Sequence, residues 1–252
     1  MTGIKTTQAA RVAGKNGFSL ISDETFRELY AALLQCRMLD ERLQAGKSYE
    51  RWTGREAGTA GVAACLRAGD SVTPSPRGLL AGYLQNGSLV PMRGAALSAM
   101  AHLTAATEEG LRHKREKLGH IAVVFASTCA LDRMRKIFAA AARQSLPLLY
   151  VLEGSVLPAD ICGSLPVIRV EGSDAVAVYR VAHESIMRAR GGGGPTIVDC
   201  AAWLGDGTHL DSLAKLERYL TGKKLFRQDW KQRLAKKYGK TLDVAVKSAG
   251  MH

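Results

Sequence analysis

The sequence lacks the features that mark several large classes of protein. No run of eighteen or more apolar residues occurs in its 252 residues, which predicts that no helix crosses a membrane. The first twenty residues contain no apolar stretch of the kind found in secretory signals. The five cysteines form no C-x-x-C pair, which argues against a zinc site and against a disulfide framework. We therefore expect a soluble protein of a reducing cytoplasm, with no association with membranes.

Negative charge is scarce at both ends of the chain. The 35 Lys and Arg residues outnumber 23 Asp and Glu, giving a net charge of +12. Residues 1–22 contain no acidic residue, and residues 215–247 carry eleven basic against three acidic residues, a net +8. Such an excess of positive charge is compatible with polyanions as partners, because net charge governs association rather than fold.

The first third of the chain has the periodicity of helices. Apolar residues recur at helical spacing after Ser22, which suits a helix start, and Gly46 is expected to end this helix. Pro74 and Pro76 predict a loop over residues 73–78. Two further helices are expected, over about 55–66 and 94–118.

From Gly119 onward, short apolar runs alternate with helical segments. Continuous apolar runs are typical of strands that are buried on both faces of a sheet, and two of them occur, at 121–126 and 147–152. Two further strands are expected, at 166–170 and 196–200. Helices are expected among them over 131–144 and 173–190. This alternation predicts an α/β fold with a doubly wound parallel sheet, preceded by N-terminal helices.

A basic helical tail is expected to follow the sheet. Its apolar residues recur at helical spacing, as at Leu213, Leu216 and Leu220, which predicts one or two amphipathic helices docked on the body with their lysines facing water. We therefore divide the chain into three parts: a flexible N-terminus (1–21), an α/β domain (22–212) and a basic helical C-terminal segment (213–252).

Several short segments carry a more specific signal. In chain order they are Asp40-Glu41-Arg42-Leu43, Gly54-Arg55-Glu56-Ala57, Leu66-Arg67-Ala68-Gly69-Asp70, Pro74-Ser75-Pro76-Arg77, Val170-Glu171-Gly172-Ser173-Asp174 and Gly194-Pro195-Thr196. Their order and spacing resemble the α subunit of the thiamine-diphosphate-dependent, decarboxylating component of 2-oxo acid dehydrogenase complexes, of pyruvate, branched-chain or acetoin type. The resemblance covers most of residues 22–248. It implies a thiamine-diphosphate-binding-like domain, an oxidoreductase activity on aldehyde or oxo groups, Mg²⁺ with thiamine diphosphate, and a β subunit as partner.

The positions at which that family holds its cofactor differ in this chain. The family's Gly-Asp-Gly is replaced by Ala126-Ser127-Thr128, and its asparagine by Gly154-Ser155. The carboxylate and the amide are thus missing, although Mg²⁺ demands near-octahedral oxygen ligands. The family's Tyr-Arg stands as Pro76-Arg77, which keeps the arginine. A segment of several tens of residues ahead of Ile121 is also missing.

The resemblance leaves four candidate site residues. Arg77, Ser127 and Ser155 stand at cofactor-binding positions, and His209 corresponds to the family's loop histidine and is the catalytic candidate; no metal ligand is expected. Each has a structural alternative: Arg77 could be a solvated surface residue, and His209 a hydrogen-bonded loop residue. Glu153 has no visible base partner, so we expect it to be structural.

Three functions follow from these observations. The first is a 2-oxo acid dehydrogenase α-subunit homologue that is cofactor-deficient and weakly active or inactive alone. The second is a non-catalytic structural or regulatory subunit of such a complex. The third is a basic nucleic-acid-binding protein, which fits the α/β body poorly. For the first two we expect an oligomer with a β-subunit-like chain or with a second copy, and a small 2-oxo acid as substrate if the protein is active.

Overall fold

The structure is a computed structural model that describes residues 21–43, 56–73, 75–89, 98–127, 131–153, 158–200 and 211–250. Its helices are α1 (Asp23–Leu43), α2 (Glu56–Ala63), α3 (Pro76–Asn86), α4 (Ala99–Arg115), α5 (Leu131–Arg143), α6 (Ala159–Cys162), α7 (Ala175–Arg190), α8 (Ser212–Gly222) and α9 (Gln228–Ser248). Its strands are β1 (Ser71–Val72), β2 (Ala122–Ser127), β3 (Leu148–Glu153), β4 (Val167–Arg169) and β5 (Thr196–Asp199).

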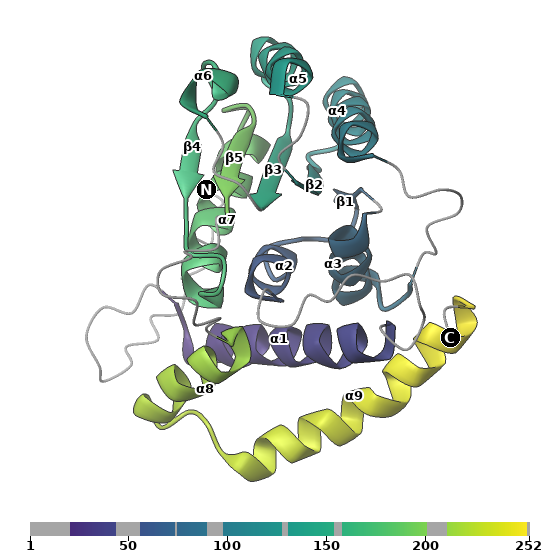
Figure 1. Cartoon of the computed structure of the whole chain (residues 1–252), viewed down its shortest axis with the longest axis vertical. Helices are drawn as coiled ribbons and strands as arrows, with labels where there is room; N and C mark the ends of the chain where they lie inside the picture. The colour runs from purple at the N-terminus through teal and green to yellow at the C-terminus, as the bar shows by residue number, and fades with distance from the viewer. Residues whose placement is uncertain are drawn as a thin grey trace, which may run out of the picture.

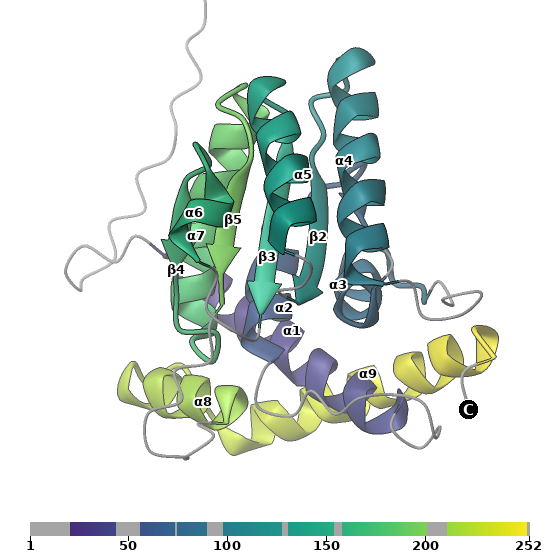
Figure 2. The same ribbon diagram turned by 45° about the horizontal axis from the view of Figure 1, so that its top comes forward.

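The strands form one parallel sheet in the order β1-β2-β3-β5-β4. Because all strands run in the same direction, their carboxyl ends lie at one edge, which we call the carboxyl edge; it faces α1 and α2 (Figure 1). Helices cover both faces of the sheet (Figure 2). The α/β class with a parallel sheet, expected from the alternation of apolar runs and helices, is confirmed.

The central strands are buried on both faces because their side chains alternate between two clusters. Val124 of β2 packs in the cluster formed with α4 and α5, whereas Val123 and Phe125 pack in the cluster formed with α2 and α7. All residues of β2 except Ser127 are buried. A strand with an apolar cluster on each side gives the continuous apolar run that the sequence displays.

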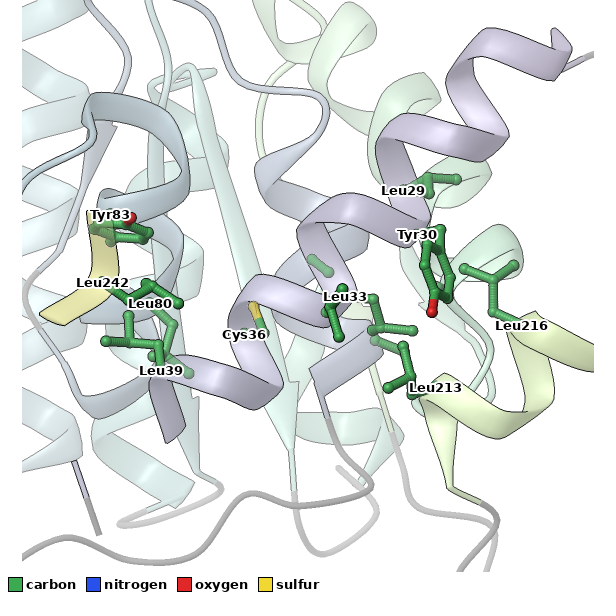
Figure 3. Close-up of a cluster of buried hydrophobic side chains, with 14 of the residues drawn as sticks. Leu29, Tyr30, Leu33, Cys36, Leu39, Leu80, Tyr83, Leu213, Leu216 and Leu242 are labelled. Atoms are coloured by element: carbon green, nitrogen blue, oxygen red, sulfur yellow. The ribbon is translucent and has the colours of Figure 1, made fainter. Parts of the chain in front are cut away.

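Helix α1 forms a further layer, with α2 and α3 on its inner side and α8 and α9 on its outer side (Figures 1 and 2). Leu33 of α1, Leu213 of α8 and Leu242 of α9 belong to one buried cluster (Figure 3). The ring of Tyr30 lies 4.9 Å from that of Trp230, centroid to centroid. The apolar residues of the expected tail helices therefore pack on α1.

The segment 73–78, expected to be a loop, contains the start of a helix. The Ser75 hydroxyl accepts a hydrogen bond from the Gly78 amide at 3.0 Å, and Pro76 is the first residue of α3. Proline suits this position because it lacks an N–H that would have no intrahelical acceptor there. The loop prediction is therefore wrong from Pro76 onward. The expected helix end at Gly46 and the flexible terminus up to residue 20 lie outside the described residues.

None of the described helices combines the length and the apolar character that crossing a bilayer requires.

A buried histidine lies near the amino end of β1. The Ser71 hydroxyl is 2.8 Å from Nε2 of His113 and donates to Glu109 at 2.6 Å. Hydrogen bonding from Arg112 lowers the pKa of Glu109 to about 2. Burial lowers the pKa of His113, a shift opposed by the negative charges of Glu109 and Asp70 and reinforced by Arg112 and His120. Protonating His113 therefore costs more in the folded chain than in the unfolded chain.

The lower pKa of His113 in the folded chain predicts that acid destabilises the protein. As pH falls below the ordinary histidine pKa of about 6.5, the unfolded state takes up the proton first, so stability is lost progressively toward the lower folded pKa. The variant His113→Gln should lose less of its unfolding free energy between pH 7 and pH 5 than the parent chain, measured by urea unfolding. His183→Gln, at an exposed position, is the matched control. If the unfolding free energy depended equally on pH in the parent chain and in both variants, His113 would not be the group that causes the loss.

Candidate functional site

The carboxyl edge brings polar residues of neighbouring strands to one level. Ser127, the last residue of β2, is paired in register with Glu153, the last residue of β3. The Cys200 amide, just after β5, donates to the Leu152 carbonyl at 2.8 Å, which places Cys200 beside them. Ligands of open parallel sheets bind outside the carboxyl ends of the strands. This edge is therefore the candidate site.

A buried ion pair occupies the edge. Arg77, in the first turn of α3, donates from Nη1 to Oε1 of Glu153. The Arg77 side chain is only 4% exposed and that of Glu153 14%. Charges this far from water are retained only when they are paired and hydrogen-bonded. The pair thus joins α3 to the end of β3 at the point where an anionic ligand would approach.

Helix α2 lies closely against this ion pair. A Cβ atom added to Gly58 would lie 2.9 Å from Oε1 of Glu153 and 3.6 Å from Nη1 of Arg77. Contacts below 3.0 Å are essentially not tolerated, so a side chain here would displace the carboxylate. Glycine at position 58 therefore lets α2 approach the pair.

A second charged network extends from the carboxyl edge to the outer layer. Arg37 of α1 is paired with Glu56, the first residue of α2, and with both carboxylate oxygens of Asp211 at 2.8 and 3.2 Å. Asp211 also caps α8, accepting from the Leu213 amide at 2.9 Å. Hydrogen bonding from Arg37 lowers the pKa of Asp211. This network fixes α1, α2 and α8 around the candidate site.

Two thiols line the same region. Burial raises the pKa of Cys36 and of Cys200 well above the ordinary thiol range. The charge of Glu56 raises the pKa of Cys36 further, as that of Glu153 does for Cys200, while Arg77 lowers both. Because the thiolate is the nucleophilic form, neither cysteine is activated for nucleophilic chemistry at neutral pH.

The described part of this edge does not fit a Mg²⁺–diphosphate unit. Mg²⁺ would need several hard oxygen ligands in octahedral geometry. At the end of β2 the chain offers the exposed hydroxyl of Ser127, and at the end of β3 a carboxylate that is engaged by Arg77. Within the described ranges, no group of three or more His, Cys, Asp or Glu side chains could hold a metal ion. The described residues of this edge therefore lack a set of ligands for the metal of this cofactor.

The structure places two of the four candidate site residues. Arg77 is buried in an ion pair, so the alternative of a solvated surface arginine is wrong, and Ser127 lies at the same edge. Ser155 and His209 lie outside the described residues, and their roles stay predictions. Sequence reasoning missed Glu153 as the partner of Arg77. The available signal was its position as a charged residue directly after a buried strand.

Comparison with known proteins finds a matching family model and several relatives. Residues 159–204 match the family model of the dehydrogenase E1 component. The chain is 27% identical to the alpha subunit of acetoin:2,6-dichlorophenolindophenol oxidoreductase of Bacillus subtilis, over 60% of each chain. It is 29% identical to the alpha subunit of 3-methyl-2-oxobutanoate dehydrogenase of Mycobacterium tuberculosis, over 76% of this chain and 64% of that protein.

A further match covers less of the chain. The chloroplastic pyruvate dehydrogenase E1 component subunit alpha-3 of Arabidopsis thaliana is 31% identical over 34% of this chain and 24% of that protein. The chain thus spans less than two thirds of the length of each of these relatives. All three are α subunits of oxidoreductases, as the short segments of the sequence led us to expect. The chain is therefore similar to α subunits of the dehydrogenase E1 component.

Proposed function

We propose that this protein is a cofactor-deficient α-type subunit, which serves a structural or regulatory role in a 2-oxo acid dehydrogenase-like assembly and is weakly active or inactive alone. The observation that carries the proposal is the buried Arg77–Glu153 ion pair at the carboxyl edge. Arg77 is the one cationic residue that the family resemblance assigns to phosphate, and its Nη1 is already engaged by a carboxylate.

Electrostatics explains why this ion pair would oppose the binding of a diphosphate. An incoming diphosphate would bring negative charge next to Glu153, and it would have to separate a cation and an anion that are both largely removed from water. Opposite charges at contact distance attract by several kcal/mol at the effective dielectric of a protein, on the order of 4 kcal/mol at 4 Å. Ser127 adds a neutral hydroxyl, which does not offset the repulsion. We infer that thiamine diphosphate with Mg²⁺ binds weakly or not at all.

The inference that the chain works as a subunit has a separate basis. Each relative reported above is named as an alpha subunit, which is one chain of a larger protein. We infer that this chain assembles with a β-subunit-like chain or with a second copy of itself. Interfaces of obligate subunits bury on the order of 2,000 Å² or more.

The alternative is an active oxidoreductase that decarboxylates a small 2-oxo acid once a partner chain completes the site. In that case the partner, or the residues that follow β2, β3 and β5, would supply the metal ligands that the described edge lacks.

Calorimetric titration separates the two functions. Thiamine diphosphate at millimolar Mg²⁺ should give no saturable heat with the chain alone or with a coexpressed β-subunit-like chain. Micromolar affinity for the chain alone would overturn cofactor deficiency. Micromolar affinity only in the coexpressed complex would establish the active alternative.

Light scattering on the same two preparations tests assembly. We expect a mass of at least two chains in one of them. A mass of one chain in both, at micromolar concentration, would contradict the subunit role.

A further inference from the structure

The outer face of α9 carries a row of cations. Arg233, Lys236, Lys240 and Lys247, which we call the outer row, are all exposed. At 100° per residue they fall within about 60° of the helix circumference, and at 1.5 Å per residue they extend over about 21 Å. The row therefore presents positive charge along one line, on the layer farthest from the sheet (Figure 2).

The row is held in a fixed orientation. The opposite side of α9 carries Leu242 and Val246, which are buried, and Trp230, Leu234 and Tyr238, which pack partly buried on the same cluster. Turning the row away from solvent would expose these side chains to water at about 25 cal/mol per Å² of apolar surface. The row is thus a preorganised surface, unlike a flexible basic arm.

The acidic residues of α9 are already engaged by arginines. Asp229 lies 3.0 Å from Arg227 and 3.0 Å from Arg233, and Asp243 lies 2.7 Å from Arg42 of α1. In the part of the chain that the structure describes, no carboxylate lies within ion-pair distance of Lys236, Lys240 or Lys247. Three lysines on one line are therefore left to interact with an external anion.

We propose that the outer row of α9 is a docking surface for an acidic helix of a partner protein. An antiparallel helix with carboxylates at i, i+7, i+11 and i+14 would meet Lys247, Lys240, Lys236 and Arg233 in turn. Pairing of charges along facing helices at such spacing sets partner choice and orientation in helical assemblies. The inference rests on α9 alone and does not depend on the state of the cofactor site.

Two features favour a protein over other polyanions. Asp229 and Asp243 lie among the cations, and each would repel a continuous phosphate backbone, whereas a protein can place neutral or basic residues opposite them. A bilayer would attract the row, but the apolar side of α9 is packed on α1 and is not free to insert.

The test uses the full chain and two synthetic helical peptides rich in alanine. The matched peptide carries glutamates at i, i+7, i+11 and i+14, and the scrambled peptide has the same composition with its glutamates distributed around the helix. At low ionic strength we expect the matched peptide to bind at least tenfold more tightly than the scrambled one. Added salt should weaken this binding, because exposed charges are screened.

The variant that tests the row replaces Lys236, Lys240 and Lys247 by glutamine and should bind the matched peptide at least tenfold more weakly than the parent chain. Its control replaces Arg115, Arg133 and Lys136, exposed on α4 and α5, and makes the same change in net charge. The control should bind like the parent. If the triple variant lost its thermal transition, Lys240→Gln alone should still weaken binding about threefold, within the range of one exposed ion pair.

Three outcomes would overturn the proposal. Equal affinity for the two peptides would show that only net charge matters. Unchanged affinity in the α9 variants would place the binding elsewhere. Tighter, row-dependent binding of a short duplex DNA, or of vesicles containing phosphatidylserine, than of the matched peptide would assign the row to phosphate groups.

Discussion

Replacing Glu153 by glutamine is expected to lower the free energy of unfolding by about 3 kcal/mol or more, because removing one member of a buried ion pair leaves the other charge uncompensated. The side chain of Arg77 is only 4% exposed, so water solvates its charge poorly once the carboxylate is lost. Asp243→Asn is the matched control: it breaks an exposed pair with Arg42, which should cost no more than about 1 kcal/mol. Urea unfolding followed by circular dichroism measures both.

The same substitution should convert Arg77 into an anion site. With Glu153 neutral, pyrophosphate can approach the guanidinium without repulsion, and a ligand that binds only the folded state stabilises it by RT ln(1 + [L]/Kd). The melting temperature of Glu153→Gln should therefore rise with millimolar pyrophosphate, while that of the parent chain should not. The double variant with Arg77→Gln should lose this response.

Two results would contradict the claim that Glu153 keeps anions away from Arg77. Equal stabilisation of the parent chain by pyrophosphate would show that the ion pair does not obstruct anions. A response that survives in the double variant would place the anion at another site.

The strands and most helices could be predicted because their signals are local. The runs at 121–126 and 147–152 are apolar throughout, and in the structure each strand indeed packs between two helical layers. The start of α3 lies within the segment predicted to be a loop, and the reason is equally local. Proline is common both in loops and at the first position of a helix, and only the Ser75 cap decides between them here.

The Arg77–Glu153 pair could not be predicted because it joins positions 76 residues apart. Three conditions bring it about: β3 must end at Glu153, α3 must begin at Pro76, and α2 must approach closely enough for Gly58 to leave room. None of these conditions is visible in the neighbourhood of either residue. The sequence retains the arginine of the family it resembles and lacks that family's carboxylate, and neither feature indicates that a different carboxylate faces this arginine.

Some residues that resemble the family have a structural role here. Asp70 ends the matching segment Leu66-Arg67-Ala68-Gly69-Asp70 and accepts four hydrogen bonds. Two come from the amides of Arg67 and Ile121, at 2.7 and 3.1 Å, and two from the guanidinium of Arg190, at 2.9 and 2.5 Å. The carboxylate side chain is fully buried, and it joins the turn after α2, the residue ahead of β2 and the end of α7.

Asp70→Ala is therefore expected to lower the free energy of unfolding by about 3–5 kcal/mol, because it leaves the charge of Arg190 without its carboxylate and two backbone amides without their acceptor. That loss is a large share of the roughly 5–15 kcal/mol that stabilises a typical domain. Arg190→Met should cost a similar amount. The double variant Asp70→Ala, Arg190→Met should cost clearly less than the sum of the two single losses, since neither partner then leaves a buried charge uncompensated.

Urea unfolding of the four chains completes this cycle, with Asp243→Ala as the exposed control, which should change the unfolding free energy by no more than about 1 kcal/mol. If the loss for the double variant equalled the sum of the two single losses, Asp70 and Arg190 would stabilise the fold independently, through different neighbours. A loss below about 1 kcal/mol for Asp70→Ala would show that the carboxylate is not needed to hold α7 against the sheet. Strong coupling would instead explain why this segment resembles the family although the residues at the carboxyl edge differ from it: Asp70 and Arg190 stabilise the parallel sheet itself, which the chain needs whether or not a ligand binds.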